Sequence, residues 1–214
     1  IYKPESGTIL VNGDRAVFNS PKDAINRGIG MVHQHFMLVP TQTVTENILL
    51  GLNDPGFIMH LPRYDQKVAD LAEKYGLKVQ PTAKIWQLSV GEQQRVEILK
   101  TLYRGAEILI LDEPTAVLAP QEIQELMETM RLMVQQGKSI VFISHKLNEV
   151  KRVADRLTVL RKGKVTADGI GLENITKETL AELMVGRKVL FQLNKNPHTP
   201  GDVVLDVQNV SALN

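Results

Sequence analysis

The chain has 214 residues, of which 43% are hydrophobic and 23% charged, and its formal net charge is +1. These values are ordinary for a globular protein, and the near-neutral charge gives no sign of a nucleic-acid-binding surface. The absence of cysteine excludes disulfides and thiolate chemistry. No apolar run approaches the ~20 residues of a membrane-spanning helix, and no signal peptide is visible. Any membrane association is therefore expected to go through a partner.

The N-terminal residues predict a hairpin, a helix and a strand in that order. Residues 8–17 contain an Asn-Gly pair, which suits the type I′ turn of a β-hairpin. A Ser-Pro pair at 20–21 predicts the start of a short helix that ends at Gly28. Residues 30–34 then predict a strand.

The pattern from 45 to 105 is mainly helical. We expect helices at 45–51, 65–75 and 90–104, each closed by a glycine. A further helix is expected at 120–136. Its apolar stripe favours core packing over a cofactor site, and comprises Ile123, Leu126, Met127, Met130, Met133 and Val134.

The stretch from Ile108 to Thr115 carries the strongest chemical signal. Its four apolar residues do not alternate with polar ones, which predicts a strand buried on both faces of a parallel sheet. Asp112 and Glu113 follow directly, where ligands bind in open α/β sheets. Two carboxylates there suit a Mg²⁺-phosphate site. The alternative is a core strand whose last two residues merely reach solvent.

Two other predicted strands also end in polar residues. The strand at 30–34 ends at Gln34, and a strand at 139–144 ends at His145. Gln34 could be an ordinary surface amide, and His145 could cap the helix that runs on to about residue 154. If all three strands lie parallel, however, their polar ends meet on one edge of the sheet, where a nucleotide binds.

A helix N-terminus is a further candidate for phosphate binding. Ser89, Val90, Gly91 and Glu92 have the capping-box spacing, so the Ser89 hydroxyl could simply cap the helix or could contact a phosphate. A Gly-Lys-Ser run at 137–139 resembles the end of a P-loop, but Leu132 stands where that motif needs glycine. We interpret Gly137 as a helix C-cap, and the sequence contains no P-loop.

The C-terminal part predicts a hairpin at 157–161 and 164–167, and then a helix at 176–185. Residues 195–201 contain two prolines and a glycine and indicate a linker. Residues 203–210 predict the beginning of another strand.

These motifs together resemble the nucleotide-binding cassette of ABC transporters. The stretch from Leu88 to Arg95, the strand from 108 to 115, Gln34 and His145 have the order and spacing of that family's signature, Walker B, Q-loop and H-loop motifs. The resemblance is strongest to the two-cassette ATP-binding subunits of simple-sugar and nucleoside importers. It implies an α/β, P-loop NTPase-like fold with a mostly parallel core sheet, an antiparallel β portion and a helical subdomain at about 42–105.

The resemblance also implies roles for particular residues. Asp112 is expected to hold Mg²⁺, and Glu113 to act as general base toward the attacking water. His145 is expected to contact the γ-phosphate of ATP. Gln34 is expected to sense that phosphate and to touch Mg²⁺ or water. Ser89 to Glu92 are expected to clasp the ATP that is bound to a second cassette.

The sequence departs from the family pattern at three points. The Walker A loop and the aromatic residue that stacks on adenine lie upstream in the family and are absent. Val90 and Glu92 replace the glycine and glutamine of the commonest signature, as occurs in the sugar-importer group. Ala119 stands where many cassettes have an aspartate.

We therefore expect an N-terminally truncated first cassette at 1–187, a linker at 188–202, and the first strand of a second cassette at 203–214. The expected partners are transmembrane permease subunits, a second cassette and, indirectly, a solute-binding protein, at the cytoplasmic face of the membrane. The alternative is a soluble two-cassette ATPase that acts on ribosomes or nucleic acid. The short proline-bearing connector and near-neutral charge count against it.

Overall fold

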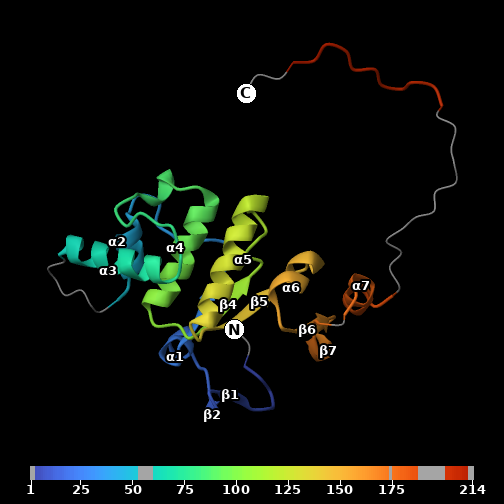
Figure 1. The fold of residues 1–214 in the computed structure, drawn as a ribbon. Helices are drawn as coiled ribbons and strands as arrows, with labels where there is room; N and C mark the ends of the chain where they lie inside the picture. The colour runs from blue at the N-terminus through green and yellow to red at the C-terminus, as the bar shows by residue number, and fades with distance from the viewer. Residues whose placement is uncertain (1–2, 53–59, 174, 188–200, 212–214) are drawn as a thin grey trace.

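The computed structural model describes residues 3–52, 60–173, 175–187 and 201–211 (Figure 1). In these residues, three parallel strands form the central sheet in the order β3-β4-β5. The strands are β3 (Ile29–Val32), β4 (Ile108–Asp112) and β5 (Ser139–Ile143). The predicted α/β fold is confirmed, because the chain combines this parallel sheet with antiparallel strands and helices.

The predicted N-terminal hairpin is confirmed. Strands β1 (Ile9–Val11) and β2 (Asp14–Ala16) pair antiparallel. The two residues between them, Asn12 and Gly13, have φ angles of 52° and 87°. Positive φ at both central positions is the requirement of a type I′ turn, which Asn-Gly meets at little steric cost.

Helix α1 (Pro21–Asn26) begins where the Ser-Pro pair predicts. The Asp23 carboxylate accepts hydrogen bonds from the backbone N–H groups of Asn19 (2.8 Å) and Ser20 (2.9 Å). These backbone hydrogen bonds hold the pKa of Asp23 below its ordinary value, because they stabilise the charged form. The bond from Asn19 has the largest effect and that from Ser20 the next. The carboxylate thus satisfies N–H groups that the helix start leaves without partners.

The region before β4 contains α2 (Val44–Leu49), α3 (Leu61–Lys74), the 3₁₀ turn η1 (Ile85–Gln87) and α4 (Val90–Tyr103). Two predicted starts were wrong. Helix α2 is capped by Thr43 rather than opened by Thr45, since Thr43 and Glu46 form the reciprocal capping box. Helix α3 begins four residues before the predicted position, with a proline in its first turn.

Helix α5 (Pro120–Gln135) lies beside the sheet, and α6 (Leu147–Val153) follows β5. Leu126, Met127, Met130 and Met133 of α5 are buried, as the apolar stripe predicts. Val134 was wrongly assigned to that stripe and is 47% exposed. It lies in the last turn of α5, which ends at Gln135.

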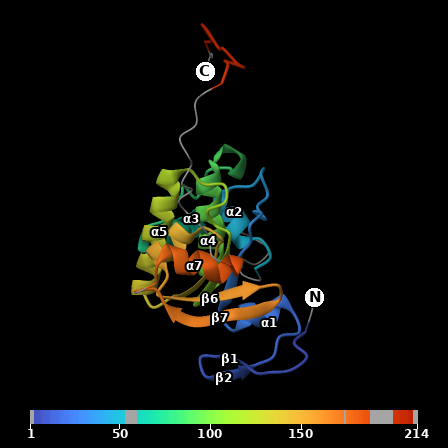
Figure 2. The same cartoon turned by 90° about the vertical axis from the view of Figure 1, so that its right-hand side faces the viewer.

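The C-terminal unit consists of β6 (Arg156–Arg161), β7 (Lys164–Gly171) and α7 (Lys177–Val185). Figure 2 shows β6 and β7 as a long two-stranded ribbon with α7 beside it. The predicted hairpin is confirmed, and its second strand continues past residue 167. Leu157, Val159, Leu172 and Leu180 form a small core of their own.

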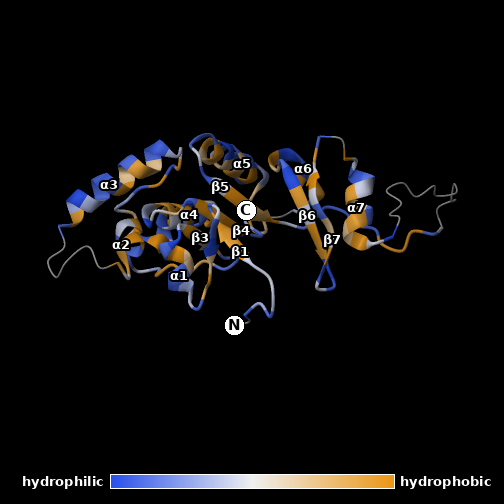
Figure 3. Cartoon of the chain, turned by 90° about the horizontal axis from the view of Figure 1, so that it is seen from below, coloured by the Kyte–Doolittle hydropathy of each residue, from blue (hydrophilic) through white to orange (hydrophobic). Residues whose placement is uncertain are grey.

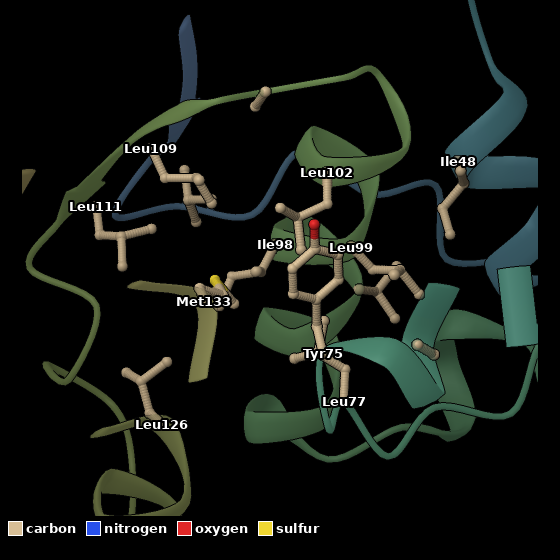
Figure 4. Close-up of a cluster of buried hydrophobic side chains, with 14 of the residues drawn as sticks. Ile48, Tyr75, Leu77, Ile98, Leu99, Leu102, Leu109, Leu111, Leu126 and Met133 are labelled. Atoms are coloured by element: carbon tan, nitrogen blue, oxygen red, sulfur yellow. The ribbon is translucent and has the colours of Figure 1, made fainter. Parts of the chain in front are cut away.

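The main core joins the sheet to the helices on one of its faces. Leu109 and Leu111 of β4 pack in one cluster with Ile98 and Leu99 of α4 and with Met133 of α5. Figure 4 shows Tyr75 and Leu77, which follow α3, directed into the same cluster. In Figure 3, hydrophobic and hydrophilic residues alternate along α3, and its buried residues Val68 and Ala72 belong to the same cluster. Helix α4 thereby packs against β3 of the sheet, and α3 packs against α4 and α2, so tertiary contacts rather than sequence propensity alone hold these helices.

The prediction that the strand beginning at Ile108 is buried on both faces was wrong. Along β4, fully buried residues alternate with partly buried ones, and along β5 partly buried residues alternate with exposed ones. The exposed positions include Val141 (49%) and Ile143 (44%). Buried side chains of α4 and α5 pack against the face of the sheet that carries Leu109 and Leu111. The residues that alternate with these, on the opposite face, therefore remain accessible.

The strand predicted at 203–210 is not formed in this structure. Its apolar side chains are exposed, including Val204 (98%) and Val203 (82%). An isolated extended segment has no ladder of hydrogen bonds, so apolar sequence alone does not make a strand. Most of the predicted linker at 188–202 and the end of the chain lie outside the described residues.

Candidate functional site

The predicted functional residues gather at the carboxyl edge of the parallel sheet. Because β3, β4 and β5 run in the same direction, the segments that follow them emerge on one edge. Strand β4 ends at Asp112, and β5 pairs with it so that Ile143 lies opposite Asp112. Glu113 and His145 therefore begin their loops side by side. This is the sheet edge where open α/β proteins bind ligands.

Glu113 and His145 are in direct contact. Nδ1 of His145 lies 2.7 Å from Oε1 of Glu113, across 32 positions of sequence. The Glu113 side chain is 19% exposed and that of His145 70% exposed. The cap hypothesis for His145 is not supported, because the N-cap residue of α6 is Lys146. The sequence prediction that these two residues converge is thus realised at hydrogen-bonding distance.

The backbone of Glu113 has an unusual conformation. Its φ is +47°, in the left-handed region that side chains other than glycine seldom adopt. Its N–H donates to the carbonyl of Ile143 (3.0 Å), and its carbonyl accepts from the N–H of Ala116 (3.1 Å). These hydrogen bonds fix the turn, and with it the direction of the carboxylate. Strained backbone of this kind clusters at functional sites because the surroundings must hold it in place.

One carboxylate oxygen of Glu113 remains available for a ligand. Oε2 is buried and has no hydrogen-bond partner among the described residues. Buried polar atoms are nearly always paired with protein or water, so this oxygen is placed to accept from a water molecule. Asp112, partly buried at the end of β4, adds a second carboxylate.

The donor set suits a Mg²⁺ ion shared with phosphates rather than a protein cage. In the described part of the chain, no group of three or more His, Asp or Glu residues could hold a metal ion. Mg²⁺ commonly keeps several waters and binds through one or two carboxylates plus substrate phosphates. Asp112 fits that pattern as the carboxylate that would hold the metal.

Gln34 lies on the same edge but is not joined to the other site residues. Strand β3 ends at Val32, two residues earlier than predicted, and Gln34 is exposed in the bend that follows. No hydrogen bond between described residues links it to Asp112, Glu113 or His145. Its role therefore stays a prediction.

The second predicted site, Ser89 to Glu92, forms the N-terminus of α4. The Ser89 hydroxyl accepts from the Glu92 N–H (3.3 Å), and the Glu92 carboxylate accepts from the Ser89 N–H (2.8 Å). The capping alternative is therefore correct for the structure as it stands. Val90 is 44% exposed, so this turn presents an accessible surface.

Gly91 lies against the start of α5. A Cβ built at Gly91 would come within 2.2 Å of Oε1 of Glu122, so a side chain at this position would displace that carboxylate. The other carboxylate oxygen of Glu122 accepts from the N–H of Ala119 (3.0 Å). Ala119 has no side-chain oxygen with which to cap α5, and Glu122 satisfies its backbone instead.

Sequence reasoning missed the residue that joins the two sites. Gln94, in the middle of α4 and buried, donates through Nε2 to the carbonyl of Pro114 at 2.6 Å. The helix that carries Ser89 is thereby tied to the loop that carries Glu113. A glutamine inside a helix gives no sequence signal for such a contact, which depends on a residue 20 positions away.

A second missed group clamps the loop after β3. The Glu97 carboxylate accepts a hydrogen bond from the N–H of Met37 (2.7 Å), and the Lys100 ammonium donates to the carbonyl of Met37 (3.1 Å). Glu97 and Lys100 also form an ion pair at 3.2 Å. Both backbone groups of Met37 are thus bound by one face of α4.

Two cavities of about 240 Å³ lie away from the Glu113–His145 pair. One lies between the start of α4, around Gly91, and α5; the other lies beside β3, near Met37. Neither is lined by Asp112, Glu113 or His145.

The exclusion of a P-loop at 137–139 is confirmed. Gly137 follows α5 with φ +83°, and its N–H donates to the carbonyl of Val134 (2.9 Å). Ser139 then begins β5. A glycine with positive φ directly after a helix is a C-cap, whereas a P-loop comes between a strand and a helix.

Sequence comparison gives close relatives among import ATP-binding proteins. The chain is 52% identical over 212 residues to the nucleoside import ATP-binding protein NupA of Lactococcus lactis subsp. cremoris. It is 50% identical to the guanosine import ATP-binding protein NupO of Bacillus subtilis, and 40% identical to a ribose import ATP-binding protein of Rubrobacter xylanophilus. Each match covers 99% of this chain but only 41–43% of the relative. The chain thus spans less than half the length of these relatives.

Structural comparison and a family match agree with this result. The fold is similar to the ATP-binding cassette MJ0796 bound to ADP and Pi, with a TM-score of 0.64 and 26% identity over 81% of this chain and 77% of that one. It is also similar to cbiO1 from Clostridium perfringens, with a TM-score of 0.67 and 27% identity over 86% and 72%. Residues 1–116 match the family described as ABC transporter. The chain therefore belongs to the ABC transporter family of ATP-binding proteins.

Proposed function

We propose that this chain forms the catalytic part of an ATP-hydrolysing subunit that powers import across a membrane. The observation that carries the proposal is the contact between Glu113 and His145 beside Asp112, on the ligand-binding edge of the sheet. Its family membership and the names of its relatives support the same activity.

Each residue has a distinct part in the proposed reaction. The free Oε2 of Glu113 accepts a hydrogen bond from the attacking water and takes its proton as the water adds to the γ-phosphorus. The bond between the γ-phosphorus and the β–γ bridging oxygen breaks at the same time, so that ADP leaves and inorganic phosphate is formed. His145, fixed by Oε1 of Glu113, directs its other ring nitrogen outward to the γ-phosphate. Asp112 would hold Mg²⁺, which neutralises developing phosphate charge when it is bound. Gln34 would sense the same phosphate and the metal or its water.

We infer that the turn from Ser89 to Glu92 acts on a second cassette. Free N–H groups at the start of a helix of this length bind anions, and the Ser89 hydroxyl lies at the same turn. No hydrogen bond between described residues connects this turn to Glu113 or His145. A phosphate bound there would belong to the facing cassette. The residues at 203–214 would begin such a cassette, after a linker at 188–202.

The transported compounds are proposed to be nucleosides or simple sugars. The relatives carry these compounds in their names, with guanosine and ribose among them. Within the described residues, no helix is both long and apolar enough to cross a membrane. Permease subunits would form the path across the membrane, with this subunit on the cytoplasmic face and a solute-binding protein acting indirectly.

The test is uptake in cells that carry the full-length polypeptide. We expect cells that lack this polypeptide to lose uptake of labelled guanosine or of labelled ribose. Restoring the gene should recover uptake of whichever compound was lost. The Glu113→Gln variant should not restore uptake. Recovery of uptake by that variant would contradict the proposed role of Glu113, and unchanged uptake of both compounds in the deletion strain would contradict the substrate class.

A further inference from the structure

A buried carboxylate cross-links the two loops that carry Glu113 and His145. Glu149 lies in the first turn of α6 and is 8% exposed. Its Oε2 accepts from the hydroxyl of Thr115 at 2.5 Å and from the hydroxyl of Ser144 at 3.3 Å. Thr115 lies two residues after Glu113, and Ser144 lies one residue before His145. A single oxygen atom thus connects both loops.

Lys146 completes this network and compensates the buried charge. Its ammonium lies 3.3 Å from Oε1 of Glu149, and it donates to the carbonyl of Thr115 at 2.8 Å. The Lys146 N–H also donates to the hydroxyl of Ser144 at 3.1 Å. Charge-assisted hydrogen bonds are stronger than neutral ones, and a buried carboxylate without a partner would be costly. Each member therefore depends on the others.

The position of the network explains how Glu113 keeps its strained conformation. Thr115 is 1% exposed. Its hydroxyl is hydrogen-bonded to Glu149 and its carbonyl to Lys146, both of which follow β5 in the chain. With Thr115 fixed, the turn that begins at Glu113, with φ +47°, cannot relax. With Ser144 fixed, the backbone next to His145 cannot move away. The 2.7 Å contact is thus held from both sides.

We propose that Glu149 is a positioning residue for ATP hydrolysis, which holds Glu113 and His145 in contact through Thr115 and Ser144. The inference rests on the proposed function, since it assigns Glu149 to the reaction at Glu113. Glu149 does not touch the reacting atoms. Its removal should therefore slow the chemical step more than it weakens ATP binding. Displacement of a catalytic group by about 1 Å can cost on the order of 10²-fold in rate.

The kinetic experiment uses the full-length polypeptide with its permease partners. We expect Glu149→Gln and the near-isosteric Thr115→Val to lower kcat for ATP by about tenfold or more, with KM changed less than twofold. Thr115→Ser keeps the hydroxyl and should retain kcat within twofold of wild type. The control is Glu178→Gln, which neutralises an exposed carboxylate in the first turn of α7. A kcat for Glu149→Gln and Thr115→Val equal to that of the control would overturn the proposal.

A second measurement separates positioning from catalysis. The imidazole NMR resonances of His145 should move in Glu113→Gln, because its hydrogen-bond partner changes. Glu149→Gln and Thr115→Val should move the same resonances in the same direction, even if Glu113 is not the base. Unmoved resonances in a folded Thr115→Val protein would refute the positioning role. Moved resonances together with full activity of Glu113→Gln would instead refute the proposed function.

Discussion

Glu113 places its two carboxylate oxygens in different surroundings. Oε1 is bound to Nδ1 of His145 at 2.7 Å, whereas Oε2 is buried without a partner in the described part of the chain. One oxygen is thus occupied in orienting the imidazole, and the other is left for a water molecule. A carboxylate arranged in this way can position the attacking water and accept its proton in one geometry.

Replacement of Glu113 by glutamine tests this division directly. The amide cannot take a proton from water, so we expect ATP turnover to fall by about 10²–10⁴-fold while ATP binding is kept. Steady-state ATPase rates and equilibrium ATP binding in the full-length polypeptide provide the measurement, with Glu178→Gln as the control. Unchanged turnover would remove Glu113 from the catalytic role.

Ser89→Arg tests the proposal that the start of α4 meets a second cassette. The arginine would fill the space for a partner's γ-phosphate, so we expect ATP-driven pairing of cassettes to weaken more than ATP binding to one cassette. Gel filtration of the hydrolysis-deficient Glu113→Gln form with ATP measures this pairing.

The matched control for Ser89→Arg is Thr176→Arg, which also removes an N-cap side chain, but from α7. Loss of a cap costs about 0.5–2 kcal/mol at either helix. Only the Ser89 variant should therefore lose pairing. Equal pairing of the two variants would contradict the proposal.

The 214-residue chain by itself should not bind ATP with micromolar affinity. Asp112, Glu113 and His145 are proposed to act on the γ-phosphate, the metal and the water. The α- and β-phosphates need the ring of N–H groups and the lysine of a P-loop, and the sequence contains no such motif. Calorimetric titration of this chain, beside a longer polypeptide that includes a P-loop, measures the difference. Micromolar binding by the 214-residue chain would show that the phosphate site was misplaced.

Gly30→Ala should destabilise the fold through the contact between β3 and α4. An added Cβ would lie 2.9 Å from Cβ of Ala106 and 3.0 Å from Cβ of Thr101, and neither atom can move without the backbone. Overpacking of this kind costs about 1–3 kcal/mol. The control is Gly171→Ala, where the added Cβ meets nothing within 4 Å. Thermal unfolding of the full-length polypeptide should show a lower Tm for Gly30→Ala alone.

The local elements could be predicted from the sequence because their causes lie within a few residues. The Asn-Gly pair at 12–13 and the Lys-Gly pair at 162–163 have the positive φ angles expected for their turns. The capping box of Ser89 and Glu92 involves groups three residues apart. Such features depend on side-chain size and on backbone dihedral preferences, which the sequence states directly.

The sequence predicted which residues share the site only to the extent that these residues follow parallel strands of one sheet. Because carboxyl ends of parallel strands share an edge, Asp112, Glu113 and His145 could be placed together from sequence. Gln34 could not be placed more finely, since the end of β3 at Val32 depends on pairing with β4. No sequence pattern indicates the hydrogen bond between Gln94 and Pro114 or the one between Glu149 and Thr115.

The features that only the tertiary structure decided involve residues that are far apart in the chain. The sequence alone indicated the strands that begin at 108 and at 139, the carboxylates that follow the first, and the helix that begins after Ser89. The fold decided that one face of β5 is exposed, that residues 203–210 form no strand, and that Glu149 reaches Thr115 across 34 positions. The physical reason is that burial and side-chain hydrogen bonds require a partner surface. Strand register and helix packing, rather than local preference, bring that surface into place.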